Sequence, residues 1–316
     1  MPYWQNVLRS FEIPWRHKYL WLLALFAGES GSGFNGSQSA RTYSSPANPT
    51  AASQQVSTWL SQHIGLIVTL AVVWLLLVIA LFILAAVCEG ALIRGSAEHD
   101  AGREFRLGSA WSAGVRTIWL IVRFRLLLIA LTLPAIFVLA AIVAAFIFAI
   151  ANSIVALAVI LGLVGFFVLL ALIVYAIYLG LLDRLGARTA ILEQQGAVAS
   201  IVRAHRLLFK RFGRVLLVWL LSIGVGIVVG IVLGIVFLIL AVPLILSVVA
   251  LASGAPSAVW AVVVISVLVL LAIGLPVSGY VNAQSSTYWT LAFRRMDIDY
   301  PPAYAAAAVP PPAPQA

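Results

Sequence analysis

The stretch from residue 215 to residue 251, VLLVWLLSIGVGIVVGIVLGIVFLILAVPLILSVVAL, contains no charged residue and no histidine. A helix needs about 20 apolar residues to cross a hydrocarbon core of about 30 Å. The stretch therefore predicts a membrane-spanning helix with residues to spare. Because Pro243 lacks a backbone N–H, we expect a kink or a break near it.

Four further stretches have a similar composition. Residues 64–87, 126–151, 154–182 and 259–281 are each long enough to cross a membrane, and none contains a charged residue or a histidine. Of the 316 residues in the chain, 63% are hydrophobic and 9% are charged, whereas a soluble domain has roughly 25% charged residues. The composition excludes a water-soluble globular enzyme and predicts at least five spans.

Residues 19–27 (YLWLLALFA) form a shorter apolar stretch behind a basic segment. The hydrophobic part of a cleaved signal peptide is one interpretation. An internal repeat favours another, because residues 9–22, 116–129 and 206–219 align without gaps and each runs from an arginine through a basic elbow into apolar sequence. The second and third copies lead into membrane hairpins, so we expect the first to do the same.

The spans and the repeat together predict an all-α fold. We expect a polytopic membrane helix bundle of six transmembrane helices, the first one short, arranged as three hairpin pseudo-repeats with amphipathic interfacial helices. Residues 1–18 would form an interfacial helix and residues 19–299 the transmembrane domain, with a flexible Gly/Ser-rich outer loop at 28–55. Residues 300–316 would form a disordered Pro/Ala-rich tail.

The basic residues predict the orientation in the membrane. All but one of the 19 Lys and Arg residues fall on one side of the six helices, and Arg41 is the exception. The positive-inside rule then places both termini in the cytoplasm and makes the chain a multi-pass protein of the cell membrane. If residues 19–27 were a cleaved signal peptide, the other five helices would keep this orientation.

Two segments on the basic side have the pattern of amphipathic helices. Residues 201–215 and 111–122 carry apolar residues at helical spacing, with basic residues off that face. Such helices lie in the membrane interface, where each Lys or Arg contributes about 1 kcal/mol of attraction to anionic headgroups. A role limited to topology is the alternative, and no nucleic-acid-binding motif accompanies the charge. The candidate anionic-lipid contacts are Arg116, Arg123, Arg125, Arg203, Arg206, Lys210 and Arg214.

Acidic residues occur where the predicted spans leave the membrane on this side. Glu89, Asp183, Glu193, Asp297 and Asp299 are placed to pair with the elbow arginines in an ion-pair layer. Exposed pairs of this kind contribute little to stability. If the layer is structural, neutralising Glu89 or Asp183 should lower thermal stability in detergent.

Small residues recur every four positions within the longest span, at Ser222, Gly226, Gly230 and Gly234. Small side chains let helix backbones approach closely in lipid. The spacing predicts a helix-packing face against a neighbouring helix of the same chain, and a homodimer interface is the alternative.

The sequence contains no set of residues that indicates catalysis. No Asp, Glu, Lys, Arg or His lies inside the five long spans, whereas proton-coupled transporters and intramembrane proteases depend on such residues. One cysteine and four separated histidines match no metal motif and no nucleophile arrangement. We therefore expect no enzymatic activity, no catalytic residue, no cofactor and no metal.

Residues 15–28 (WRHKYLWLLALFAG), the Gly/Ser-rich sequence after them and residues 89–95 (EGALIRG) carry a family resemblance. This pattern resembles uncharacterised bacterial multi-pass membrane proteins that are similar to the membrane domain of glycerophosphoryl diester phosphodiesterase, over about residues 5–295. The resemblance implies association with a lipid-active enzyme. It implies no catalysis by this chain, because the soluble catalytic domain of that family is absent.

The leading hypothesis is a non-enzymatic integral membrane protein whose basic interfacial helices contact anionic lipid or a membrane partner. An uncoupled transporter or channel-like protein for a small or lipidic substrate is the alternative, as is an accessory membrane domain for a separately encoded enzyme. A continuous polar cavity that reaches the membrane midplane would favour transport. Lipid-filled clefts would favour the first hypothesis.

Overall fold

The computed structural model describes residues 3–27, 63–253, 256 and 259–296, and this part of the chain contains helices and no strand. The predicted all-α class is confirmed. The predicted outer loop 28–55, the tail 300–316, Asp297 and Asp299 lie outside the described residues. The helices are α1 (Tyr3–Arg16), α2 (Tyr19–Phe26), α4 (Ile64–Asp100), α5 (Leu107–Ala151), α6 (Val155–Leu192), α7 (Ala197–Lys210), α8 (Phe212–Ala252) and α9 (Val259–Met296).

Five helices, α4, α5, α6, α8 and α9, are long and apolar enough to cross a membrane. Almost none of the residues in their most apolar windows is buried within the protein, as expected for side chains that face lipid. These helices correspond to the five long stretches that the sequence predicts as spans, and only Ile154 of those stretches lies outside them. The predicted break at Pro243 is absent, because α8 continues through it to Ala252.

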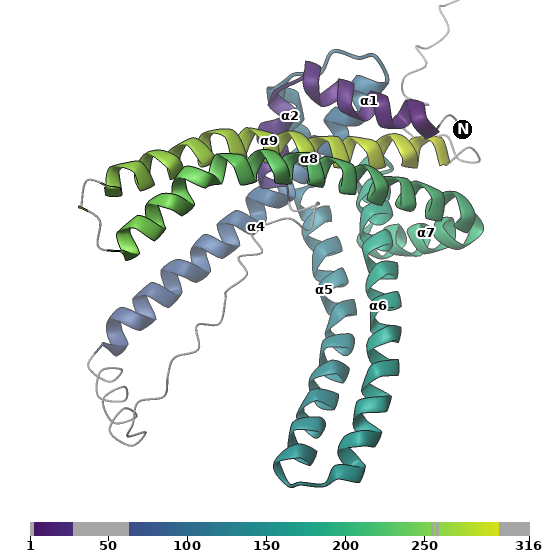
Figure 1. Cartoon of the computed structure of the whole chain (residues 1–316). Helices are drawn as coiled ribbons and strands as arrows, with labels where there is room; N and C mark the ends of the chain where they lie inside the picture. Colours follow the sequence, from purple (N-terminus) through teal and green to yellow (C-terminus); the bar gives the residue numbers. More distant parts are fainter. Residues whose placement is uncertain (1–2, 28–62, 254–255, 257–258, 297–316) are drawn as a thin grey trace, which may run out of the picture.

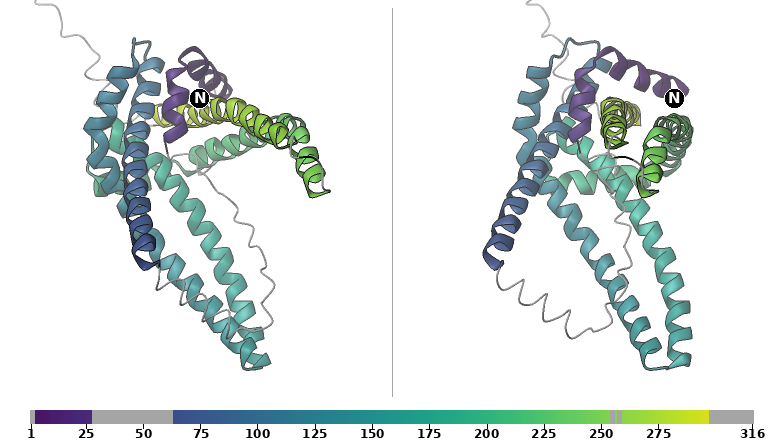
Figure 2. Two further views of the ribbon diagram at one scale, coloured as in Figure 1. Left: turned by 90° about the vertical axis from the view of Figure 1, so that its left-hand side faces the viewer. Right: turned by 60° about the vertical axis from the view of Figure 1, so that its left-hand side comes forward.

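Every long helix has an exposed apolar part and a part that is packed against other helices. The exposed parts form three arms, which are α4 alone, the α5–α6 hairpin and the α8–α9 hairpin, and the arms diverge from a common centre (Figure 1). The two further views show the same divergence (Figure 2). The centre, called the head below, consists of α1, α2, α7, residues 86–100 of α4, 107–128 of α5, 179–192 of α6, 212–221 of α8 and 279–296 of α9.

The head is a tertiary core built largely from continuations of the spans. Trp289 and Phe293 of α9, Phe124 of α5 and Leu185 of α6 are almost fully buried there. The basic segment 111–122 is part of α5 itself rather than a separate interfacial helix. Arg211, by contrast, separates α7 from α8 as two elements.

The short apolar stretch 19–27 belongs to the head. It forms α2, which has eight residues, and Leu20, Leu23 and Ala24 are completely buried. These side chains pack with residues of α4 and α9 in one hydrophobic cluster. The six-helix arrangement and the three hairpin pseudo-repeats are therefore not confirmed. Helix α2 has only eight residues and packs one side against other helices, although its Leu22 and Phe26 are exposed.

Two glycines, Gly90 and Gly114, lie where α4 and α5 pack closely. A Cβ atom added at Gly114 of α5 would lie 2.2 Å from the carbonyl oxygen of Val87, and one added at Gly90 of α4 would lie 2.5 Å from Thr117 Oγ1. Only glycine fits at Gly114, because the opposing atom belongs to the backbone. Neither Gly90 nor Gly114 belongs to a regular stripe of small residues, so no local pattern predicts this contact.

The stripe that the sequence does predict as a packing face lies open. A Cβ atom at Gly226, Gly230 or Gly234 would meet no atom within 4 Å, and Ser222, Gly226 and Gly230 line a groove of about 380 Å³ between α8 and α9. The described residues give no support for packing of these glycines against a helix of the same chain, because the space beside them is open. Helices α8 and α9 do meet elsewhere, for example where Phe237 lies near Gly274. The homodimer alternative stays a prediction.

Candidate functional site: the charged head

Arg125 of α5 joins carboxylates from two neighbouring helices. Its guanidinium group donates to both carboxylate oxygens of Glu89 on α4, at 2.8 and 2.9 Å, and to both of Asp183 on α6, at 2.9 Å. The side chain of Glu89 is only 2% exposed, whereas those of Arg125 and Asp183 are 20% and 22% exposed. The prediction that Glu89 and Asp183 pair with an elbow arginine is confirmed. Because Glu89 is buried, its ion pair differs from the weak exposed pairs that the sequence suggests.

Other carboxylates tie further helix ends together. Asp100 at the end of α4 accepts from Arg9 of α1 at 2.9 Å and is also paired with Arg294 of α9. Glu193 is paired with Arg203 of α7. The head therefore contains the ion-pair layer that the acidic residues predict, with Asp297 and Asp299 outside the described part.

These pairings divide the seven candidate lipid contacts. Arg125 and Arg203 are engaged by carboxylates, so their assignment as lipid contacts is corrected. The other five side chains are exposed. Arg123 lies over the Trp119 ring at 5.0 Å. Three arginines have no hydrogen bond or ion pair from their side chains within the described part of the chain: Arg116, Arg206 and Arg214.

Helix α7 exposes an apolar row beside Arg206 that sequence analysis missed. The apolar face that the spacing predicts for residues 201–215 includes Ala204 and Leu208, and these two side chains are buried in the head instead of facing lipid. Val198, Val202 and Phe209 are exposed instead, and their spacing places them on one face. The helix thus packs on the protein with one face and presents a second apolar face outward.

Two other helices of the head expose large apolar rows. On α1 the spacing of Trp4, Leu8 and Trp15 places these exposed side chains on one face. On α5 the exposed side chains are Trp111, Val115 and Trp119, which recur every four residues. Arg116 and Arg123 belong to the same segment of the helix. Tryptophan favours the membrane–water interface because its ring is amphipathic. The head therefore combines unpaired arginines with aromatic rows of the kind found at that interface.

Two histidines that are far apart in sequence stack in the head. The rings of His17, between α1 and α2, and His99, near the end of α4, have centroids 3.6 Å apart and are nearly parallel. The Tyr19 hydroxyl forms a 2.7 Å hydrogen bond with His99 Nε2. Both rings lie outside the apolar stretches that would cross the membrane. The two histidines lie 82 positions apart in the sequence, and no local pattern links them.

Burial is the main cause of a lowered pKa at both rings. Burial and then the charge of Arg16 lower the pKa of His17, whereas burial and then His17 lower the pKa of His99 to about 4. The folded head therefore holds both rings neutral at pH 7. If α1 and α2 detached from the rest of the head, the rings of His17 and His99 would bind protons more readily than they do in the folded head.

We accordingly expect acid to weaken the docking of α1 and α2. Because the folded-state pKa values are below the ordinary value of 6.5, stability is full above about pH 6.5 and is lost as the pH falls toward 4. Thermal unfolding in detergent at pH 7.5 and pH 5 measures this loss. The variant His17→Phe can stack but cannot be protonated, so its loss between the two pH values should be smaller. An equal loss in both proteins would contradict the role of the stacked pair.

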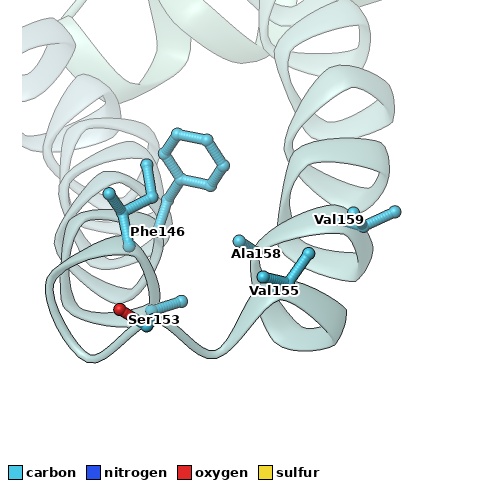
Figure 3. Close-up of a pocket in the computed structure, with 7 residues that line it drawn as sticks. Phe146, Ser153, Val155, Ala158 and Val159 are labelled. Atoms are coloured by element: carbon cyan, nitrogen blue, oxygen red, sulfur yellow. The ribbon is translucent and has the colours of Figure 1, made fainter.

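The cavities of the described residues are mainly apolar. One of about 550 Å³ lies at the tip of the α5–α6 arm. Its lining residues come from both helices and the turn between them, and Ser153 is the one with a polar side chain (Figure 3). A more polar cavity of about 270 Å³ lies in the head, lined in part by Arg94, Glu98 and Arg116.

No group of three or more His, Cys, Asp or Glu side chains that could hold a metal ion is found within the described ranges. Cys88 is buried and unpaired. Many charged groups of the head form ion pairs, several arginines are exposed beside apolar rows, and the buried Arg188 donates to the backbone carbonyl groups of Arg184 and Ser286. This arrangement can hold helices together and can meet anions at a surface.

The comparisons with known proteins give a family and no activity. A family of unknown function, DUF7544, matches residues 5–293. The chain belongs to the DUF7544 family. No curated protein and no solved structure matches the chain. The DUF7544 match begins within α1 and ends within α9, so it includes the head and all three arms.

Proposed function

We propose that this member of the DUF7544 family is a non-enzymatic protein of the cell membrane whose head binds anionic lipid headgroups. The observation that carries the proposal is the presence of unpaired, exposed Arg116 and Arg206 beside exposed apolar rows on α5 and α7. The apolar rows would enter the acyl boundary, and the guanidinium groups would meet phosphates. With the termini in the cytoplasm, this contact would form on the inner leaflet, where anionic lipids are concentrated.

The ion pairs of the head support a division of labour among its basic residues. Arg125 and Arg203 hold helices together, whereas Arg116, Arg123 and Arg206 carry exposed charge. A chain that needed positive charge only for topology would not require aromatic rows beside it. The apolar cavities fit lipid-filled clefts.

An uncoupled transporter or channel is the second candidate. The groove between α8 and α9 favours it to a limited extent, because Ser222, Asn282, Gln284 and Ser285 bring polar groups to its wall. An accessory role for a separately encoded lipid-active enzyme is compatible with the same lipid-binding head.

The proposal predicts that exposed charge sets the preference for anionic lipid. In the variant Arg116→Gln/Arg123→Gln/Arg206→Gln, each change should remove about 1 kcal/mol of attraction, so the triple variant should bind phosphatidylglycerol on the order of 100-fold more weakly. Native mass spectrometry of the protein in mixed phosphatidylglycerol and phosphatidylcholine micelles measures the lipid retained.

The matched control is Arg116→Lys/Arg123→Lys/Arg206→Lys, which keeps the charge and should retain phosphatidylglycerol. Higher salt should reduce retention by the natural protein, because screening weakens exposed charges. Equal retention by the glutamine variant and the natural protein would overturn the proposal.

A further inference from the structure

Helices α1 and α8 both reach α9, but they pack little against each other, and a groove remains between them. Figure 1 shows α1 lying across the start of the α8–α9 arm. The groove has a volume of about 640 Å³, within the range of roughly 300–1,000 Å³ typical of ligand pockets. Its walls are Trp4, Val7, Phe11, Leu217, Leu220, Leu221, Gly224, Val225, Val228 and Val229.

The chemistry of these walls fits a hydrocarbon chain. The Trp4 indole N–H is the only polar side-chain group among the lining residues. Gly224 leaves open space along α8, since a Cβ atom there would meet nothing within 4 Å. One wall belongs to α1, which is a helix of the head and not one of the five candidate spans. An occupant would therefore lie at the level of the head, between the arm and an interfacial helix.

A positive charge lies on the same face of α8, on the head side of the groove. Arg214 precedes Leu217 by three residues and Leu221 by seven, so these side chains share one face of the helix. Arg214 is exposed, and its side chain has no hydrogen bond or ion pair within the described residues. An apolar groove that begins beside an unpaired guanidinium group matches a molecule with an anionic head and a hydrocarbon tail.

We propose that this groove holds one acyl chain of an anionic phospholipid whose phosphate is bound by Arg214. The inference rests on the proposed function and assigns it a specific site. A second copy of the chain fits less well, because a two-fold contact through this face would place the Arg214 side chains of both copies in one interface.

Photolabelling tests the site directly. The full chain is placed in nanodiscs that contain phosphatidylglycerol with a photoactivatable diazirine in its acyl chain, and the labelled peptides are identified by mass spectrometry. We expect label on the α1 peptides that carry Val7 and Phe11. The variant Gly224→Trp fills the groove and should reduce that label at least about tenfold, whereas Gly234→Trp, at another open glycine of α8, should leave it unchanged.

The headgroup is tested by Arg214→Gln, which should reduce labelling by phosphatidylglycerol several-fold, and by Arg214→Lys, which should not. If Gly224→Trp left the labelling of α1 unchanged, the assignment of the groove as the acyl-chain site would be overturned. Equal labelling by phosphatidylcholine, or no effect of Arg214→Gln, would overturn the anionic assignment. The variant Arg116→Gln/Arg206→Gln separates the two proposals, because it should lower total phosphatidylglycerol retention while the label on α1 remains.

Discussion

Gly114→Ala is expected to lower the free energy of unfolding of the head by about 3 kcal/mol, at the upper end of the usual cost of overpacking. The added methyl group would lie 2.2 Å from the Val87 carbonyl oxygen, and that atom belongs to the backbone of α4. Relief therefore requires α4 and α5 to move apart. Thermal unfolding in detergent, followed by tryptophan fluorescence, should show a midpoint lower by several degrees.

Gly108→Ala is the matched control on the same helix. A Cβ atom at Gly108 would meet nothing within 4 Å, so alanine should be neutral or should stabilise α5 by up to about 1 kcal/mol through its higher helix propensity. A Gly114→Ala midpoint equal to that of Gly108→Ala would show that α4 and α5 do not approach as closely as described.

The glycines of this fold show that regular spacing and close packing do not coincide. Gly226, Gly230 and Gly234 have the spacing of a packing stripe, yet a Cβ atom added at any of them would meet nothing within 4 Å. Gly90 and Gly114 have no such spacing and lie where α4 and α5 pack closely. Spacing shows which residues share a face, but it does not show which helix covers that face. That information comes from tertiary contacts between residues far apart in the chain.

The membrane spans could be predicted because their signal is local. A run of apolar residues long enough to cross the hydrocarbon core is visible in any one stretch, such as 64–87. The head could not be predicted in the same way, because it is held together by contacts between helices that are far apart in the sequence. Much of it consists of continuations of the spans, which no local signal separates from the spans themselves. Residues 19–27 look like a short span in sequence, but α2 finds its apolar partners on α4 and α9.

Only those features of the candidate site that have a local signal could be predicted. The basic character of the head and the pairing of Glu89 and Asp183 follow from residue types near span ends. The three-dimensional arrangement decides which arginines the carboxylates engage. Because Arg125 and Arg203 are engaged in this way, they are not among the candidate lipid contacts. The exposed row of Val198, Val202 and Phe209 was missed because the other face of α7 has the clearer apolar pattern.

Arg125→Met should destabilise the head by about 3–5 kcal/mol, the usual range when one partner of a buried ion pair is removed. The change would leave Glu89, which is 2% exposed, without the guanidinium group that now meets both of its oxygens. Asp183 would lose the same partner. Because Arg125 joins α4, α5 and α6 at one point, the thermal midpoint should fall while helix content, measured by circular dichroism, remains close to that of the natural protein.

The control Arg123→Met removes an exposed arginine two positions away. It should cost at most about 0.5–1 kcal/mol, because the contact with Trp119 is an exposed cation–π interaction. A loss for Arg125→Met no larger than that for Arg123→Met would show that the three charges do not hold the helices together.

Second-site changes separate a buried unpaired charge from simple loss of packing. In the Arg125→Met background, Glu89→Gln removes the buried charge and should restore a large part of the stability, because a neutral amide costs less to bury than an unpaired carboxylate. Glu89→Gln alone should cost less than Arg125→Met, since Arg125 would still donate to both oxygens of Asp183. If Glu89→Gln made the Arg125→Met protein less stable, the loss would arise from packing of the arginine stem. The ion pair would then not be what fixes α4 against α5 at the base of the arms.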